Sequence, residues 1–170
     1  MKQGITSVYI VSIKTKAIFW SEYTYYRSLI LEDDVQRRSL HRPEQIIDYS
    51  CLLYGSTLEG RRMAVKDVLH SSSKLPIPVI PEQGVYMMPT ASIKNKSNAW
   101  IAYHHIYRYE KKNSGTYVTF YDGSGCYVEI SLNAFDLQYK RTSQLIVHLN
   151  RPVLFGQSRF PAMKLFHQHL

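Results

Sequence analysis

The chain has 170 residues, 45% hydrophobic and 20% charged, a balance that argues against disorder and fits one globular domain. Its 21 Lys+Arg against 13 Asp+Glu give a formal net charge of +8. The excess lies mainly in residues 86–170, which carry 10 basic and 4 acidic side chains. Such a surface suits nucleic-acid phosphates, an anionic membrane or an acidic protein, and is equally compatible with mere solubility.

The cysteines and the N-terminus point to a reducing compartment. Cys51 and Cys126 lie far apart and outside any metal-ligand spacing, which favours buried free thiols over a disulfide. Lys14 and Lys16 interrupt the N-terminal apolar stretch, which lacks the features of a secretory signal. No run approaches the ~18 apolar residues of a membrane span. We therefore expect a cytoplasmic protein without membrane association.

The first 41 residues resemble β-strands in composition. Residues 7–13 and 16–23 are rich in β-branched and aromatic side chains and predict a β-hairpin. Residues 26–41 can be read as a strand, an acidic turn and a second strand.

A helix is predicted next. Pro43 suits the first helical turn, Glu44 favours its positive end, and Gly55 offers a C-terminal cap. Its buried face is expected to include Ile46, Ile47, Leu53 and Tyr54.

A second helix is indicated from Ser56 to about His70. Ser56 and Glu59 have the spacing of a capping box. The spacing also places three basic side chains on one broad face, namely Arg61, Arg62 and Lys66. This helix pair has the form of a helix-turn-helix, a weak pattern by itself.

The middle of the chain predicts a turn-rich stretch at 75–84 and a strand at 85–90. Residues 91–98 form a polar loop that carries Lys94 and Lys96. Residues 99–109 alternate as one strand, in which His104 and His105 would point to opposite faces and could not chelate a metal together. Tyr103, Tyr107 and Tyr109 would form a row on one face of that strand.

The clearest hairpin joins residues 115–121 to 126–130 through an Asp122-Gly123 turn. A helix is predicted over 132–149. Its buried stripe comprises Phe135, Tyr139, Thr142, Ile146 and Leu149, and Lys140, Arg141, Gln144 and His148 lie largely off it.

The sequence offers no catalytic constellation. The Asp122–Gly125 segment is too short for a phosphate-binding loop, is fully explained as a hairpin turn, and no dinucleotide fingerprint occurs. We expect no enzyme activity, no cofactor and no metal. The tyrosine row could stack on bases of single-stranded nucleic acid, although such a face is more often core.

Six motifs together resemble the competence transcription factor (ComK) family. The resemblance runs from about Leu29 to Thr142, while the first 25 or so residues match poorly and nothing after Asn150 corresponds. The motifs are DYSCLLYGSTLEGRR at 48–62, KLPIPV at 74–79, VYMMPT at 85–90, AWI at 99–101, VTFYDG at 118–123 and NAFDLQYKRT at 133–142.

The resemblance implies a bacterial, sequence-specific DNA-binding activator of genes for DNA uptake. It implies recognition of paired A/T-rich boxes in double-stranded DNA, mainly through the minor groove, by homodimers that assemble further. RNA polymerase and a proteolysis adaptor are further partners that it suggests. Arginine suits a narrow A-tract minor groove, and lysine and glutamine can read its acceptors. The candidate DNA-binding residues are Arg61, Arg62, Lys66, Lys94, Lys96, Lys140, Arg141 and Gln144.

We therefore expect an α+β domain over residues 1–150, with antiparallel hairpins, a helix pair near 43–70 and an amphipathic helix near 132–149. Residues 151–170 would form a C-terminal tail. The alternative is a basic protein-interaction or single-stranded nucleic-acid-binding module without activator function.

Overall fold

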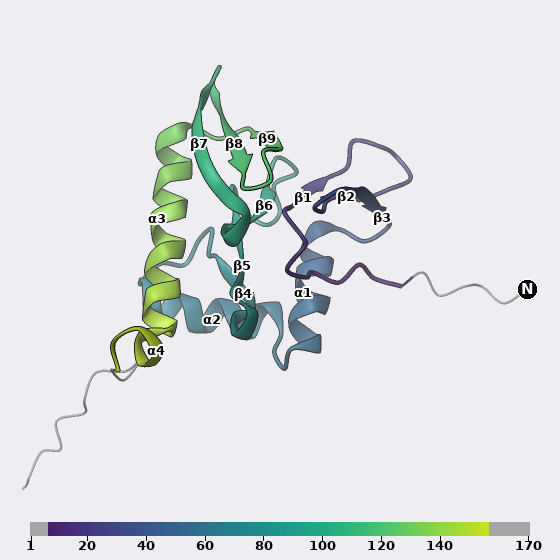
Figure 1. The fold of residues 1–170 in the computed structure, drawn as a ribbon. Coiled ribbons are helices and arrows are strands. Elements are labelled where there is room, and N and C mark those ends of the chain that lie inside the picture. The colour runs from purple at the N-terminus through teal and green to yellow at the C-terminus, as the bar shows by residue number, and fades with distance from the viewer. Residues whose placement is uncertain (1–6, 157–170) are drawn as a thin grey trace, which may run out of the picture.

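A six-stranded antiparallel sheet runs through the middle of the molecule in the computed structural model, which describes residues 7–156 (Figure 1). Its order is β3-β2-β1-β6-β5-β4. The strands are β1 Ala17–Trp20, β2 Ser28–Leu31, β3 Gln36–Ser39, β4 Ile77–Ile80, β5 Val85–Pro89 and β6 Ala99–Ala102.

Over residues 7–156, a smaller antiparallel sheet and four helices complete an α+β fold, as predicted. The second sheet has the order β7-β8-β9 and comprises β7 Ile106–Lys112, β8 Gly115–Phe120 and β9 Gly125–Val128. The helices are α1 Pro43–Leu53, α2 Leu58–Leu69, α3 Leu132–Leu149 and α4 Arg151–Phe155, with short 3-10 turns η1 Pro81–Gln83 and η2 Tyr103–His105.

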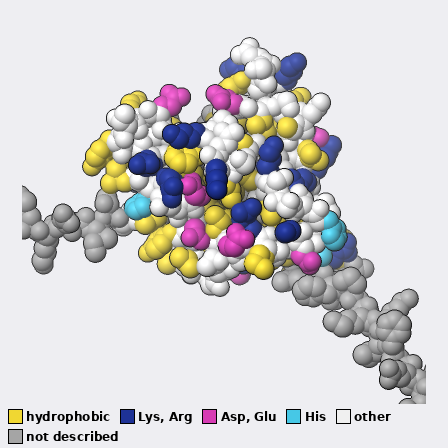
Figure 2. All heavy atoms as spheres, turned by 180° about the vertical axis from the view of Figure 1, so that it is seen from behind, with side chains coloured by type: hydrophobic (Ala, Val, Ile, Leu, Met, Phe, Trp, Pro, Cys, Tyr) yellow, Lys and Arg dark blue, Asp and Glu magenta, His cyan; other side chains and the backbone are white. Residues whose placement is uncertain are grey.

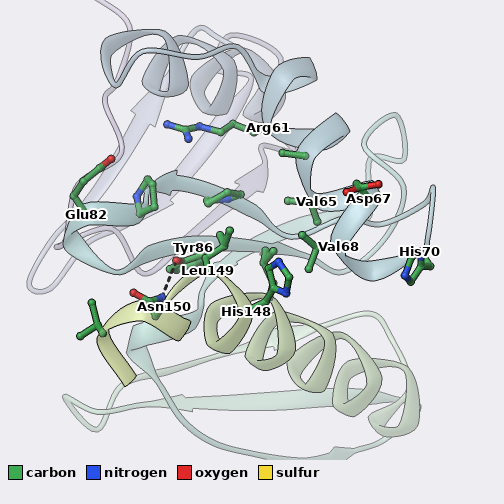
Figure 3. Close-up of a pocket in the computed structure, with 15 residues that line it drawn as sticks. Arg61, Val65, Asp67, Val68, His70, Glu82, Tyr86, His148, Leu149 and Asn150 are labelled. Carbon is green, nitrogen blue, oxygen red and sulfur yellow. Dashed lines mark hydrogen bonds between the residues drawn. The ribbon is translucent and has the colours of Figure 1, made fainter. Parts of the chain in front are cut away.

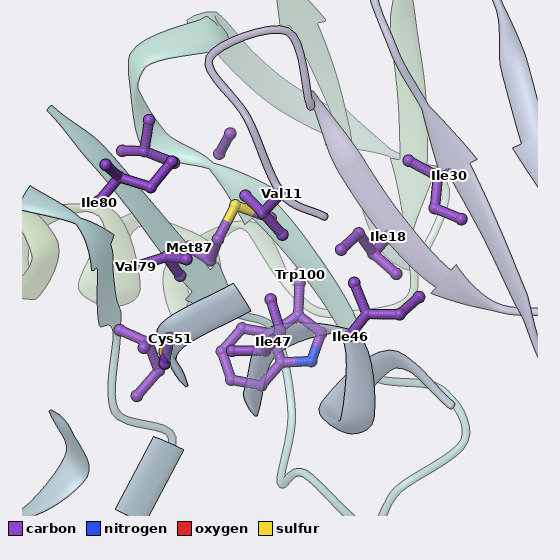
Figure 4. Packing of buried hydrophobic residues seen from close by; sticks show 13 residues of the cluster. Val11, Ile18, Ile30, Ile46, Ile47, Cys51, Val79, Ile80, Met87 and Trp100 are labelled. Atoms are coloured by element: carbon purple, nitrogen blue, oxygen red, sulfur yellow. The ribbon is translucent and has the colours of Figure 1, made fainter. Parts of the chain in front are cut away.

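The large sheet buries both faces because its side chains alternate. Ile18 pairs with Trp100 across β1 and β6, and both pack toward α1, where Ile46 and Ile47 complete the cluster (Figure 4). The neighbouring pair of Ala17 and Ile101 belongs to the cluster on the opposite face, with residues of the second sheet and of α3. The sheet is therefore the middle of three layers.

The predicted hairpin over residues 7–23 is wrong. Residues 7–13 form no strand, and β1 pairs instead with β2 and β6. The earlier segment is held by packing: Val11 is buried, and its backbone N–H donates to Ser50 Oγ at 2.9 Å. The strand, turn and strand predicted within residues 26–41 are confirmed as β2 and β3.

Helix α1 forms as predicted, and Gly55 follows it at a φ of +86°, a value that favours glycine. The expected burial of Leu53 and Tyr54 is wrong, since they are 55% and 39% exposed. The helical repeat explains this, because the buried positions recur at three- and four-residue spacing and leave residues 52–54 outside. The buried residues of α1 are Pro43, Ile46, Ile47, Ser50 and Cys51.

Helix α2 begins one residue later than the Ser56 capping box predicts. Thr57 is the N-cap, and its hydroxyl accepts from the Gly60 N–H at 2.9 Å. The Asp48 carboxylate on α1 accepts from the Leu58 N–H at 2.8 Å, so α1 helps to cap α2.

The single strand predicted at 99–109 is wrong. It divides into β6, the turn η2 and β7, and these two strands belong to different sheets. His104 and His105 consequently reach the same group rather than opposite faces: each Nε2 lies within 2.8 Å of the Ile13 carbonyl oxygen. The turn-rich stretch at 75–84 contains β4, whose Pro78 is tolerated because β4 is an edge strand.

The hairpin with the Asp122-Gly123 turn is confirmed as β8 and β9, and α3 has the predicted bounds. Phe135 and Thr142 are buried as expected, whereas Tyr139, Ile146 and Leu149 are half-buried. Gln138 and Leu145 complete the buried face.

Candidate nucleic-acid interface

Lys and Arg side chains gather on the face shown in Figure 2, most densely over the part of the molecule that carries β1, β2 and β3. Within the described ranges, no group of three or more His, Cys, Asp or Glu residues could hold a metal ion. Over residues 7–156, no helix has the length and apolar character needed to cross a bilayer. The basic surface is thus the principal candidate site.

Arg141 on α3 is fixed by two hydrogen bonds. It donates to Gln138 Oε1 at 2.7 Å and to the Ser73 carbonyl at 3.1 Å. Burial lowers the pKa of its guanidinium, which stays cationic at neutral pH because arginine ordinarily titrates above ~12. Arg141 therefore presents its charge from a set position.

The buried side chain of Gln138 joins three elements beneath Arg141. Its Nε2 donates to the Lys74 carbonyl and to the Pro89 carbonyl, each at 2.8 Å. These bonds tie α3 to the segment before β4 and to the end of β5. The exposed Lys74 is thereby placed near Arg141, and the loop after β5 starts at the same junction.

Lys94 and Lys96 are exposed in that loop, whose base is rigid. Asn98 Oδ1 accepts from the backbone N–H groups of Thr90 and Ala91 at 3.0 and 2.9 Å. At its far side Lys96 Nζ lies 6.0 Å from the centre of the Trp20 ring on β1. We call the series Arg141, Lys74, Lys94 and Lys96 the basic path.

An aromatic and basic loop that the sequence analysis did not identify lies beyond Lys96. Residues 21–27 connect β1 to β2, and all of them except Tyr25 line a hollow of about 280 Å³ together with Trp20 and Lys96. Arg38 on β3 lies over the ring of Tyr23, which also lines the hollow. The run SEYTYYR was the available signal, because three tyrosines beside an arginine are unusual in a short strand connection.

The three basic residues predicted to share one face of α2 have different surroundings in the structure. Arg61 turns back to α1 and donates to the Tyr54 carbonyl at 3.1 Å, while its Nε is buried without a partner in the described structure. Arg62 Nη1 lies 3.5 Å from Glu59 Oε2, and Lys66 is exposed. Arg61 is therefore held against the end of α1. Arg62 is likewise half-buried but lies beside Glu59, whereas Lys66 is exposed.

Arg61 also lines a groove between α2 and the end of α3, with a volume of about 760 Å³ (Figure 3). The floor is largely apolar and includes Val65, Tyr86 and Leu149, and Asn150 donates to the Tyr86 hydroxyl at 3.4 Å. Of the eight candidate residues, Arg61 alone lines this groove. The groove is thus distinct from the basic path.

Lys140 and Gln144 are exposed on α3. Lys140 Nζ pairs with Asp136 Oδ2 at 2.6 Å, and the Tyr109 hydroxyl donates to the other oxygen at 2.7 Å. The bonds from Lys140 and then Tyr109 lower the pKa of Asp136, so the carboxylate stays charged. The ammonium of Lys140 accordingly has the negative charge of Asp136 beside it.

The predicted tyrosine row does not form. Tyr103 stacks on Tyr139 at a centroid distance of 4.7 Å, and Tyr109 packs on Tyr139 as well. Tyr107 is exposed elsewhere and contacts Tyr121. Tyr103 and Tyr109 thus both pack on α3, whereas Tyr107 lies apart from them, at the register shift of β7 between Ile106 and Arg108.

Comparison with known proteins gives the family. The family model described as ComK protein matches residues 6–152, a range that extends beyond both ends of the motif resemblance. The competence transcription factor of Bacillus subtilis (strain 168) is 34% identical over 119 residues, which are 69% of this chain and 62% of that protein. The match thus spans less than two thirds of the length of this curated relative, and no solved structure matches significantly. On the match over residues 6–152, the chain belongs to the ComK protein family.

Proposed function

We propose that this protein is a bacterial, cytoplasmic, DNA-binding transcriptional activator of competence genes that acts without enzyme activity or cofactor. It binds paired A/T-rich boxes in double-stranded DNA, mainly through the minor groove, as a homodimer that assembles further on DNA. RNA polymerase and a proteolysis adaptor are its further partners. Family membership and the name of the Bacillus subtilis relative support this proposal.

The observation that carries the proposal is the basic path. Four cations from α3, from the segment before β4 and from the loop after β5 are linked through the buried Gln138 and the capped loop base. None of Lys74, Lys94 and Lys96 has a carboxylate within 4.0 Å in the described part of the chain. Free lysines in series suit a phosphate backbone, because each can replace a condensed counterion.

The other candidate residues have graded roles in this proposal. Lys66 and Gln144 are exposed and free to contact DNA. Arg62 and Lys140 would share their charge with Glu59 and Asp136, and their contribution is correspondingly smaller. Arg61 acts mainly by fixing the surface that the others present, whereas Arg141 both fixes that surface and contributes its charge to the basic path.

The test measures binding of a labelled duplex with two A/T-rich boxes, against a scrambled duplex, by fluorescence anisotropy across a salt titration. We expect a preference for the paired boxes. The double variant Lys94→Ala/Lys96→Ala should bind more weakly, with a salt slope reduced by about 2. Lys111→Ala/Lys112→Ala at the tip of the β7–β8 hairpin is the control with equal charge loss.

A third duplex separates the grooves. Replacing A·T by I·C pairs keeps the minor-groove acceptors and changes the major-groove pattern. Retained binding supports minor-groove recognition, and lost binding points to the major groove. If wild type shows no preference and both double variants bind alike, the protein is a basic interaction module rather than a DNA-binding activator.

A further inference from the structure

Arg38 rests on a support of tyrosines. Its guanidinium carbon lies 4.1 Å from the centre of the Tyr23 ring and 5.9 Å from that of Tyr26. Tyr25 packs edge-on against Tyr26 at a centroid distance of 5.0 Å. Stacking on an aromatic face engages the flat side of the guanidinium, so its in-plane N–H groups stay available for a further acceptor.

The neighbouring arginine is engaged differently. Arg37 Nε donates to Glu32 Oε2 at 2.8 Å, whereas no carboxylate lies within 4.0 Å of Arg38 in residues 7–156. Successive residues of a strand point to opposite faces, which directs Arg38 to the loop and Arg37 away from it. Arg38 is therefore an oriented and exposed cation whose charge is not neutralised by a partner.

Tyr23, the ring nearest to Arg38, is open to solvent at 62% exposed, and Tyr26 is half-buried. Tyr25, which packs against Tyr26, is 70% exposed. Tyrosine hydroxyls are common donors to phosphate oxygens. Arg27 and Lys96 line the same hollow, and Glu22 is the one acidic residue among its lining, so the surroundings are net positive.

This loop continues the basic path, because Lys96 contacts Trp20 at the foot of the loop. We propose that residues 21–27, together with Arg38, form a second DNA-contacting element, in which Arg38 binds phosphate oxygens of the duplex that lies on the basic path. The inference rests on the proposed function, and it adds residues outside the family motifs quoted for the chain.

The test compares three variants on the duplex with paired A/T-rich boxes. Arg38→Ala should weaken binding about tenfold and lower the salt slope by about 1. Arg38→Lys should keep the slope but recover only part of the affinity, because an ammonium group lacks the planar fork. Lys112→Ala is the matched control, since Lys112 is also a cation over a tyrosine, 4.9 Å from the centre of the Tyr117 ring, but lies on the distant β7–β8 hairpin.

The outcomes separate this inference from the proposed function. If Arg38→Ala binds like wild type while Lys94→Ala/Lys96→Ala binds weakly, the loop is not a contact element and the proposed function stands. If wild type fails to bind any duplex, the proposed function fails. If single strands outcompete duplex and Tyr23→Ala removes that binding, the loop stacks on bases and the duplex contact is wrong. Thermal melting of each variant establishes that the fold is retained.

Discussion

The Nζ atom of Lys16 lies 2.8 Å from Asp122 Oδ2 and joins the two sheets across 106 positions of sequence. Lys16 precedes β1 and is 5% exposed, while Asp122 sits in the turn between β8 and β9. The same ammonium donates to Ser124 Oγ at 2.9 Å and to the Asp33 carbonyl at 3.2 Å. All three of its protons are thus satisfied, as burial of a charge requires.

The Lys16–Asp122 pair should make stability sensitive to Asp122→Asn. The amide can still accept from Ser124 but leaves the buried ammonium without its counter-charge. We expect a loss of about 1–3 kcal/mol, measured by urea unfolding. Lys16→Met should cost less, because the partly exposed Asp122 carboxylate stays hydrated. Equal stability of Asp122→Asn and wild type would contradict this role.

The Lys16–Asp122 pair also makes the stability of the fold depend on pH. The bonds from Lys16 and then Ser124 hold the pKa of Asp122 well below its usual range. Its stabilisation is therefore complete above the ordinary aspartate value of about 4 and is lost as the pH falls through the lower folded value. When the urea midpoint is plotted against pH, its decrease on the acid side should be smaller for Asp122→Asn than for wild type.

Arg141→Ala is expected to lower stability as well as DNA binding. The substitution removes the hydrogen bonds to Gln138 and Ser73, and it leaves Gln138 Oε1 buried without a donor. An unsatisfied buried acceptor costs about 1–3 kcal/mol, so thermal melting should report a clear decrease. Gln144→Ala on the exposed face of the same helix is the control, and an equal melting temperature for both variants would count against the structural role.

His104 should make the protein less stable in mild acid. Burial lowers the pKa of its imidazole, and its Nε2–H donates to the Ile13 carbonyl at 2.8 Å. The unfolded chain then binds a proton more readily than the folded one as the pH drops below about 6.5, so stability falls there. Urea midpoints at roughly pH 7 and pH 5.5 should converge in His104→Gln but not in His70→Asn, which removes an exposed histidine.

Both cysteines should be unreactive in the folded protein. Cys51 is fully buried, whereas Cys126 is half-buried rather than buried as expected. Burial raises the pKa of Cys51 to about 11 and that of Cys126 to about 12. The thiolate is the reactive form, so a disulfide-exchange reagent should label neither residue until urea is added. Single-cysteine variants assign the rates, and labelling of either native thiol at the rate of free cysteine would show that it is accessible.

The sequence predicted those elements whose boundaries are set locally. Pro43 and Gly55 frame α1, the Asp122-Gly123 turn frames the β8–β9 hairpin, and the amphipathic period identifies α3. Each signal lies within the element or beside it. The exposure of Leu53 was missed because both faces of α1 are apolar near its end, and only the neighbouring sheet decides which face is buried.

Elements that depend on distant partners could not be predicted this way. The composition of residues 99–109 suits a strand throughout, but β6 and β7 are in different sheets because β6 pairs with β1, far earlier in the sequence, whereas β7 forms a hairpin with the adjacent β8. Arg141 is a similar case at the candidate site. Its spacing on α3 marks it as outward-facing, and the Ser73 carbonyl that engages it comes from 68 positions earlier.

The strand order of the large sheet also works as a spacer. β3 carries Arg38, and β6 follows the loop that carries Lys94 and Lys96. Three strand intervals separate these two strands, and at ~4.8 Å each they amount to about 14 Å. Along B-DNA the same length covers about four base pairs at ~3.4 Å each. Because a hydrogen-bonded sheet cannot stretch, the pairing of β1 with β6 fixes the spacing along the DNA between the two proposed contacts. Loop insertions that leave this pairing intact do not change the spacing.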